Sequence, residues 1–311
     1  MSERTSKGGG PVALSLTDRV VATAMAAGAG FNTEAVTWPI GKGHRRKRSP
    51  NRAEIRAQKS RRCRWLRKHG KAHPDLAVLA SEVAACGHHR LRQRCLHLAC
   101  LRCAPALQGL LVRVMRRLTA SDAPEAWMAV SVILPPCAPM REIDFVGEGQ
   151  RYAAILRKAG ITRGVFGLDA SWNEDRRDRL PEAERFDPHV SVHLWGLVPA
   201  VEAVLAKAVL KKLVPRTKAV PRPVHVKPWD GGLGAIAYAL KPEFEGRHTI
   251  EKRGAREGKP VRDTRKRDLT VPQQIQAVRA LARAGLTGRI VLLGFRFEAV
   301  KLGRLCLVPT L

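Results

Sequence analysis

Four cysteines lie within eighteen residues of this 311-residue chain, and their spacing constrains the local fold more tightly than any other feature of the sequence. The pattern is Cys86-x8-Cys95-x4-Cys100-x2-Cys103. A Cys-x2-Cys turn brings two thiolates to one tetrahedral zinc ion, and two further cysteines can complete the set. The sequence therefore predicts a structural zinc site, with buried or free cysteines as the alternative. Three histidines among the cysteines could each replace one ligand: His88, His89 and His97.

The chain also carries a large excess of positive charge. Its 56 lysines and arginines exceed its 27 acidic residues by 29, and its isoelectric point is near 11.0. Such a chain attracts polyanions, so nucleic acid is the expected partner. Of two basic tracts, residues 42–71 and 247–267, the first predicts a solvated arm or a basic helix, with DNA binding as the sharper interpretation. The predicted DNA contacts are Arg61, Arg62, Arg64, Arg113, Arg116, Arg117, Arg265, Lys266 and Arg267.

Cysteine usage and hydropathy indicate the compartment. No apolar run in the sequence is long and uninterrupted enough to cross a bilayer. The apolar residues 20–29 lack the basic start of a signal peptide, since Asp18 and Arg19 precede them. Clustered cysteines in a chain of this length favour a metal over disulfides. We therefore expect a cytoplasmic protein with no membrane partner.

Helical and extended patterns mix along the chain without strict alternation, which predicts an α+β fold with a mostly antiparallel sheet and flanking helices. We expect a basic, partly disordered arm over residues 1–80, a cysteine-rich zinc segment and helix over 81–122, and a sheet domain over 123–311. Expected strands are 127–134, 164–170, 190–198, 223–226 and 289–297, with a charged, hairpin-like excursion over 172–187. Expected helices are 107–118, 150–160, 201–213, 233–240 and 273–284.

Residues 187–196 alternate between polar and apolar side chains. On a strand, His189, Ser191 and His193 share one face. Polar groups on a buried strand need partners, and imidazole is a common metal ligand. Side chains two residues apart are about 6.6 Å apart at Cα and could share one divalent ion. His189 and His193 are about 13 Å apart, so a shared ion would need a bulge or a water between them.

The chain has only two tyrosines. Tyr238 lies in the glycine-rich residues 231–242, and on a helix it would share a face with Lys241. A phenol becomes a nucleophile when a cation or metal stabilises its phenolate, and a nearby lysine is one such cation. The local residues alone favour a core tyrosine beside a surface lysine, with a catalytic tyrosine as the alternative. Tyr152, in an expected helix away from these motifs, is a poor second nucleophile.

The order of these features resembles the rolling-circle replication initiator (Rep) proteins of bacterial plasmids, members of the HUH endonuclease superfamily. The likeness covers residues 86–297 and leaves the N-terminal third unmatched. The similar segments are residues 95–103 (the cysteine-rich segment), 127–134 (the first apolar strand), 188–193 (the metal motif) and 238–241 (the tyrosine motif).

The resemblance implies an HUH-like or RRM-like sheet that carries a histidine-bound Mg²⁺ or Mn²⁺ ion, with Asp169 as the candidate third ligand. It implies that Tyr238 attacks single-stranded or hairpin origin DNA, leaving a 5′-phosphotyrosine and a free 3′-OH for a polymerase. Lys241 would neutralise charge on the phosphate or phenolate, and the metal would act as a Lewis acid. A host helicase and polymerase are further implied partners.

One position departs from the family pattern, which has His-hydrophobic-His where this chain has Ser191. Either His189 pairs with the weak ligand Ser191, or Ser191 pairs with His193. The chain would then be a slow nickase, complete its site with Asp169 and water, or retain DNA binding without cleavage. The competing functions are a non-catalytic zinc-containing DNA-binding protein and a relaxase or transposase of the same superfamily.

Overall fold

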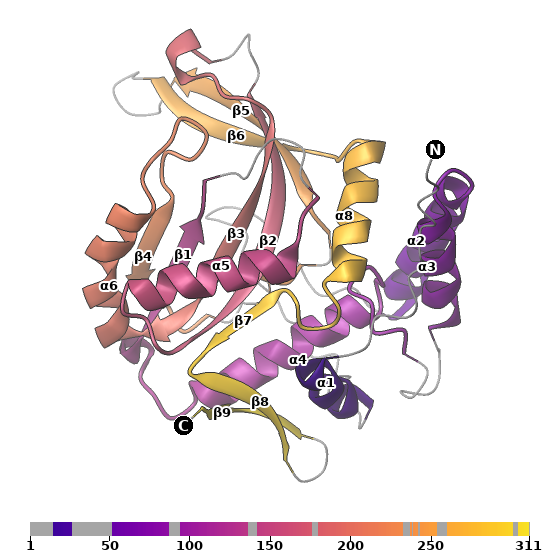
Figure 1. Ribbon diagram of the computed structural model, residues 1–311, viewed down its shortest axis with the longest axis horizontal. Coiled ribbons are helices and arrows are strands. Elements are labelled where there is room, and N and C mark those ends of the chain that lie inside the picture. Colours follow the sequence, from indigo (N-terminus) through magenta and orange to yellow (C-terminus); the bar gives the residue numbers. More distant parts are fainter. Residues whose placement is uncertain are drawn as a thin grey trace, which may run out of the picture.

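The computed structural model is an α+β structure with one curled, mostly antiparallel sheet and helices around it (Figure 1). This confirms the predicted class. The described residues are 15–26, 52–86, 94–135, 142–175, 180–232, 237, 239–241, 243–253, 260–300 and 304–310.

Seven of the described strands form the main sheet in the order β4-β1-β3-β2-β5-β6, and β7 pairs with the same edge of β2 as β5. All neighbours are antiparallel except β2 and β5. A separate two-stranded sheet joins β8 to β9. The strands are β1 (Trp127–Ile133), β2 (Gly164–Asp175), β3 (His189–Pro199), β4 (Val224–Pro228), β5 (Glu245–Arg253), β6 (Pro260–Arg267), β7 (Ile290–Leu293), β8 (Phe295–Val300) and β9 (Arg304–Pro309).

The pleat of the sheet gives it two chemically different faces. On β2, Leu168 points to one face and is fully buried, whereas Asp169 and Ser171 point to the other. The register sets Asp169 opposite His193 and Ser171 opposite Ser191. Because directly opposed residues share a face, the polar side chains of both strands gather together. This polar face comprises Asp169, Ser171 and Asn173 of β2 with His189, Ser191 and His193 of β3.

Helices cover the opposite, apolar face and one end of the sheet. In Figure 1, α5 crosses the apolar face, where a side chain at Gly149 would contact Leu168 and Val291. α4 packs against β9, and α3 packs against α2. The helices are α1 (Leu16–Ala26), α2 (Arg52–Gly70), α3 (Pro74–Ala85), α4 (Cys103–Leu118), α5 (Phe145–Lys158), α6 (Ala200–Leu213) and α8 (Val271–Arg283).

Most predicted elements are confirmed with shifted ends, namely β1 to β4 and the helices α4, α5, α6 and α8. Two predictions were wrong in part. β2 continues to Asp175, so the excursion expected over 172–187 begins inside a strand. The strand expected over 289–297 is two strands, because Gly294 between them has a left-handed φ of 62°. The helix expected over 233–240 falls mostly outside the described residues.

The basic tract is helical over its described part. Residues 52–70 form α2, which confirms the basic helix there, while residues 42–51 lie outside the described residues. The described parts of the predicted arm also contact the C-terminal third. Oδ1 of Asp18 accepts hydrogen bonds from the backbone N (2.8 Å) and Oγ1 (2.7 Å) of Thr287, and Asp75 pairs with Arg279 at 2.6 Å. The division into residues 1–80, 81–122 and 123–311 stays a prediction.

No helix in the described part of the chain combines the length and the apolar character needed to span a bilayer.

Candidate metal centre and polar face

The four cysteines predicted to bind zinc come together. Their ligand atoms all lie within 4.8 Å of one another, and among the described residues they are the one group of three or more Cys, His, Asp or Glu placed to hold an ion. Sγ of Cys103 lies 3.6 Å from Sγ of Cys86 and 3.8 Å from Sγ of Cys95. Four sulfurs at about 2.3 Å from a tetrahedral ion would lie about 3.8 Å apart. The cluster therefore fits a tetrahedral metal ion.

The ends of two helices assemble this cluster. Cys86 caps the C-terminus of α3, and Cys103 is the first residue of α4. The backbone N of Cys100 donates to the carbonyl of His97 at 3.0 Å, which forms the turn that leads into α4. Nε2 of His97 lies 2.9 Å from Glu82, so this imidazole is engaged outside the cluster. The other candidate replacements, His88 and His89, lie outside the described residues.

The four thiols influence one another's protonation. Hydrogen bonding to Cys100 lowers the pKa of Cys86 and raises the pKa of Cys95. A divalent cation would stabilise the thiolate form of all four.

A buried lysine lies against the cluster. The side chain of Lys59, on α2, is 5% exposed, and its Nζ donates to the carbonyls of Cys86 (2.8 Å) and Ala84 (3.1 Å). No carboxylate of a described residue pairs with it. A buried ammonium without a counter-charge is costly, and four thiolates around one divalent ion carry a net charge of about −2. The ammonium of Lys59 therefore places a positive charge beside the backbone of Cys86, one of the four cysteines. Sequence reasoning missed it, because it is one of many basic residues in its tract.

Both histidines of the polar face have a lowered pKa, but they differ in their partners. Burial, with Arg247 and Lys241 nearby, lowers the pKa of His193 to about 4. Nε2 of His193 lies 2.6 Å from Oγ of Ser131 on β1. Burial also lowers the pKa of His189, whose Nδ1 lies 2.9 Å from the carbonyl of Asp187. Since a carbonyl only accepts, Nδ1 carries the proton. The buried Nε2 of His189 has no hydrogen-bond partner among the described residues.

Asp169 and Lys241 form a buried ion pair on the same face. Nζ of Lys241 lies 2.9 Å from Oδ2 of Asp169 and 3.8 Å from Glu245, and the two paired side chains are 12% and 4% exposed. Oδ1 of Asp169 is buried and has no hydrogen-bond partner in the described part of the chain. Burial raises the pKa of Asp169, against the pull of Lys241 and Arg289. The structure thus pairs Asp169, which was predicted to bind the divalent metal, with Lys241, which was predicted to neutralise charge on the phosphate or phenolate.

The predicted divalent-metal ligands share a face but do not meet at one point. Asp169 lies opposite His193, whereas His189 lies opposite Asn173, four residues farther along β2. Oδ2 of Asp169 contacts Lys241, and Nε2 of His193 contacts Ser131. The described donors Asp169, Ser191, His189 and His193 therefore form no three-ligand site as they stand. Nε2 of His189 is the donor atom in this set that fits a metal best, because its ring is already oriented by the Nδ1 hydrogen bond.

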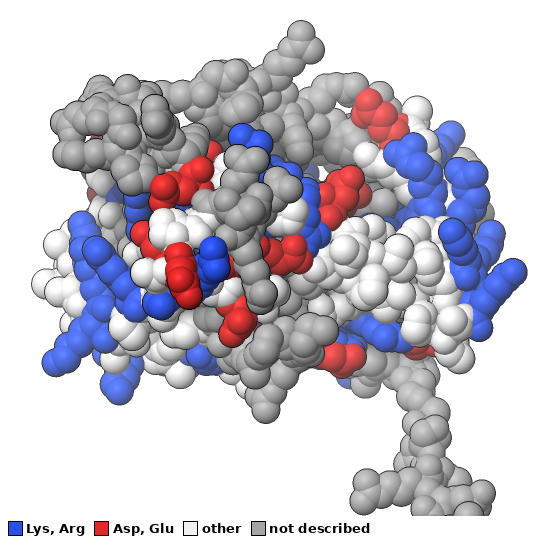
Figure 2. All heavy atoms as spheres, turned by 90° about the horizontal axis from the view of Figure 1, so that it is seen from above, with Lys and Arg blue, Asp and Glu red and all other residues white. Residues whose placement is uncertain are grey.

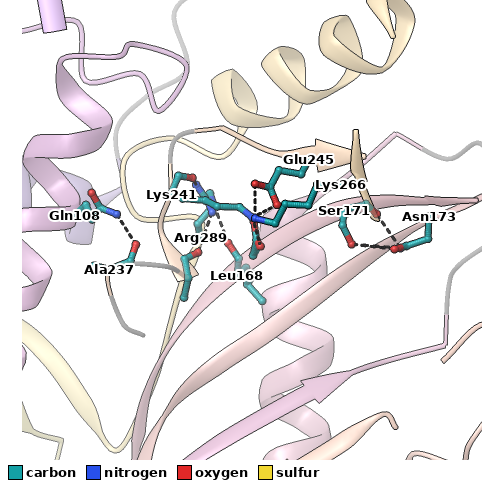
Figure 3. Close-up of polar contacts among 11 residues, drawn as sticks. Gln108, Leu168, Ser171, Asn173, Ala237, Lys241, Glu245, Lys266 and Arg289 are labelled. Atoms are coloured by element: carbon teal, nitrogen blue, oxygen red, sulfur yellow. Dashed lines mark hydrogen bonds and ion pairs between the residues drawn. The ribbon is translucent and has the colours of Figure 1, made fainter. Parts of the chain in front are cut away.

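The backbone on both sides of Tyr238 is held by two buried side chains, although Tyr238 itself lies outside the described residues. Nε2 of Gln108, on α4, donates to the carbonyl of Ala237. Arg289 donates from Nη2 to the carbonyl of Ala239 (2.9 Å) and from Nη1 to the carbonyl of Lys241 (2.8 Å). Figure 3 shows Gln108 and Arg289 approaching this backbone from opposite sides. Sequence reasoning identified neither residue.

Comparisons with models of protein families, with curated proteins and with solved structures found no match.

The two parts of the site are connected through α4, which begins at Cys103 in the cluster and carries Gln108. Ala239 also lies against β2, because a side chain at Gly167 would come within 2.8 Å of its Cβ. Gly167 lies two residues from Asp169 and on the same side of the strand. The described part of the segment that contains Tyr238 is therefore in contact with the polar face.

The predicted DNA contacts differ in their availability. In Figure 2, lysines and arginines gather at both ends of the molecule, toward α2 and toward α6. The exposed ones are Arg61, Arg64, Arg116, Arg117, Arg265 and Lys266, and Arg62 and Arg113 are half-buried. Lys266 pairs with Glu245 at 2.8 Å. Arg267 is engaged within the protein: it binds Glu174, and its Nη1 donates to Gln273 at 2.9 Å, so its guanidinium joins β6 to β2 and α8. Its contact with DNA stays a prediction.

Proposed function

We propose that this chain is a DNA nickase of the rolling-circle initiator type, with Tyr238 as nucleophile. The observation that carries the proposal is the contact between the tyrosine segment and the polar face: Ala239 lies against Gly167, and Lys241 pairs with Asp169, which lies opposite His193. The order of the cysteine cluster, the first strand, the histidine strand and this segment is what resembles the Rep proteins.

In the proposed reaction, the phenol oxygen of Tyr238 forms a bond to phosphorus, and the bond from phosphorus to the 3′ oxygen breaks. The phenol proton is balanced by the proton gained on the new 3′-OH, and a 5′-phosphotyrosine remains. Lys241 and the nearby Arg247 place positive charge on this face, where it would stabilise the extra negative charge on the phosphate.

A Mg²⁺ or Mn²⁺ ion belongs to this proposal, because the resemblance implies it. His189 is the residue that would hold it, through the buried Nε2, which no described residue engages in a hydrogen bond. When bound, the ion would supply Lewis-acid chemistry at the phosphate. The other ligands would be water or phosphate oxygens, since Asp169 and His193 are engaged with Lys241 and Ser131.

Zinc is the proposed occupant of the cysteine cluster, and its role is structural. Four cysteines leave no open coordination position for chemistry, and their sulfur spacing suits a tetrahedral ion. The buried ammonium of Lys59 supports this assignment. Exposed arginines on α2, among them Arg61 and Arg64, would bind the phosphates of single-stranded DNA.

Covalent trapping tests the nickase directly. Wild-type protein is incubated with Mn²⁺ and a pool of random-sequence single-stranded DNA labelled at its 3′ end, because a 5′-phosphotyrosine retains that label. We expect labelled protein on a denaturing gel from the wild type and none from Tyr238→Phe.

Tyr152→Phe is the matched control for this experiment. Its hydroxyl is buried, donates to the carbonyl of Val192 at 2.6 Å and accepts from the backbone N of Leu134 at 3.0 Å, so it is not available as a nucleophile. The control should still give labelled protein. Equal labelling of Tyr238→Phe and the wild type would contradict the assignment of the nucleophile.

A zinc-containing DNA-binding protein without nuclease activity is the second candidate. It is favoured by the ion pair of Asp169 with Lys241 and the contact of His193 with Ser131, which occupy two predicted metal donors. Wild-type protein that shifts the labelled DNA in a native gel, yet gives no covalent product with Mn²⁺, would establish this function in place of the nickase.

A further inference from the structure

Alternate backbone carbonyls of residues 237–241 are held by side chains from distant parts of the chain. Gln108 binds the carbonyl of Ala237, and Arg289 binds those of Ala239 and Lys241 (Figure 3). Gln108 is 6% exposed and Arg289 is 1% exposed. The donors of both side chains are therefore shielded from water. Hydrogen bonds are electrostatically stronger in such a protein interior than in water.

Arg289 also ties this segment to the centre of β2. Its Nε donates to the carbonyl of Leu168 at 2.8 Å, one residue before Asp169. This carbonyl lies where β2 changes partners, between its pairing with β7, which ends at Gly167, and its pairing with β5, which begins at Ser171. One guanidinium thus fills the gap in the sheet edge and fixes two carbonyls of the neighbouring segment.

Filling space in the core does not by itself explain why Arg289 is buried. Its guanidinium lies 5.4 Å from the ring centre of Phe145 and 5.0 Å from that of Phe244, and burial lowers its pKa to about 10. Among the described residues, its hydrogen bonds all go to backbone carbonyls rather than to a carboxylate. Burying an arginine costs more than burying an apolar side chain of similar size, so filling space alone does not account for it.

We infer that Gln108 and Arg289 are positioning residues that hold the backbone of residues 237–241 on the polar face. This inference rests on the proposed function of Tyr238, since the two side chains grip carbonyls on both sides of it. They act through the segment and do not touch the reacting atoms. Because Gln108 follows Cys103 by five residues on α4, about 7.5 Å along the helix axis, the hold on Ala237 is built on the helix that the cysteine cluster begins.

Three test variants and two matched controls separate this role from general stability. Gln108→Met and Arg289→Met remove the donors at similar size, and Arg289→Lys keeps the charge with a single donor group. The matched controls are Gln274→Met, which removes a similar bond to the carbonyl of Leu269, and Arg279→Met, which removes an arginine paired with Asp75.

The first readout is amide hydrogen exchange of the peptide that covers residues 237–245, measured by mass spectrometry without DNA. Exchange there should be about tenfold faster in Gln108→Met and Arg289→Met, because local opening becomes easier. Exchange in the control variants should stay within about twofold of the wild type. The amides of β1 and β3 in the same experiment report whether each variant is folded.

The second readout is the rate of covalent product formation. At saturating DNA we expect this rate to fall on the order of 10- to 100-fold in the two variants, with Arg289→Lys between them and the wild type. The DNA concentration at half-saturation should change by less than about threefold, because phosphate binding depends on other residues.

The outcomes keep the two proposals distinct. Unchanged exchange over residues 237–245 in both variants would overturn the inference, whether or not the protein nicks DNA. Faster exchange with an unchanged rate of product formation would also overturn it. Absence of product from the wild type would refute the proposed function, while the exchange data would still decide whether these side chains hold the segment.

Discussion

Lys59→Met should weaken zinc binding by the cysteine cluster without unfolding the protein. The substitution keeps the length and the apolar stem of the side chain and removes its charge. In the structure this ammonium donates to the carbonyls of Cys86 at 2.8 Å and Ala84 at 3.1 Å, and no carboxylate of a described residue neutralises it. Its charge therefore lies beside the backbone of Cys86, a residue of the cluster.

The expected loss of zinc affinity follows from what Lys59→Met changes in the metal-free and in the zinc-loaded protein. In the metal-free protein, removal of a buried charge relieves a desolvation cost, so the free energy of unfolding should be unchanged or slightly higher. In the zinc-loaded protein, the variant loses the support of the Cys86 loop and the charge that offsets the thiolates. Removal of such supporting groups costs about 10- to 100-fold in metal affinity, or about 1.4–2.7 kcal/mol.

Competition with a chromophoric chelator measures this affinity. Reduced protein is titrated with zinc in the presence of the chelator, for the wild type, Lys59→Met and Lys68→Met. Lys68 is an exposed lysine on the same helix, so its variant controls for the loss of one positive charge. Equal affinities for the Lys59 and Lys68 variants would refute the reasoning, as would binding of less than about one zinc ion per wild-type chain.

Two further predictions follow from the charges. Asp169→Ala should lower the free energy of unfolding in urea by about 3–5 kcal/mol, because it leaves the buried ammonium of Lys241 without its closest partner. The double variant Asp169→Ala with Lys241→Met should recover much of this loss. A double variant no more stable than Asp169→Ala would contradict this prediction. Affinity for single-stranded DNA should fall with salt by a logarithmic slope of about −0.7 per phosphate contact, so loss of Arg61 and Arg64 should flatten it by about 1.4. Arg267→Met should leave that slope unchanged, and a flat slope for the wild type would argue against phosphate binding.

The sequence predicted what depends on local pattern. The alternation from His189 to His193 specified one strand and its polar face, and the cysteine spacing predicted the cluster. The strands β5 and β6 escaped prediction because their sequences are rich in charge and lack apolar alternation. Some of their polar side chains pair with each other, as Glu245 does with Lys266, and the sequence alone does not reveal such pairs.

The contacts that define the candidate site are long-range and so were not predictable. Gln108 and Arg289 bind backbone carbonyls 129 and about 50 residues away. Every residue has a backbone carbonyl, so the sequence does not indicate which one is bound. The pairing of Lys241 with Asp169 likewise depends on how the segment lies against β2. Residue type and order singled out Asp169 and Lys241 as candidates, but their pairing, and the contacts of Gln108 and Arg289, required the fold.

Mapping the protein–DNA linkage tests the central claim most directly. After the trapping reaction with Mn²⁺, the complex is digested with nuclease and protease, and the peptide that carries a residual nucleotide is identified by mass spectrometry. The account predicts a phosphotyrosine linkage on the peptide that contains Tyr238. A nucleotide on Tyr152 or on any other residue, or DNA cleavage without a covalent linkage, would contradict it.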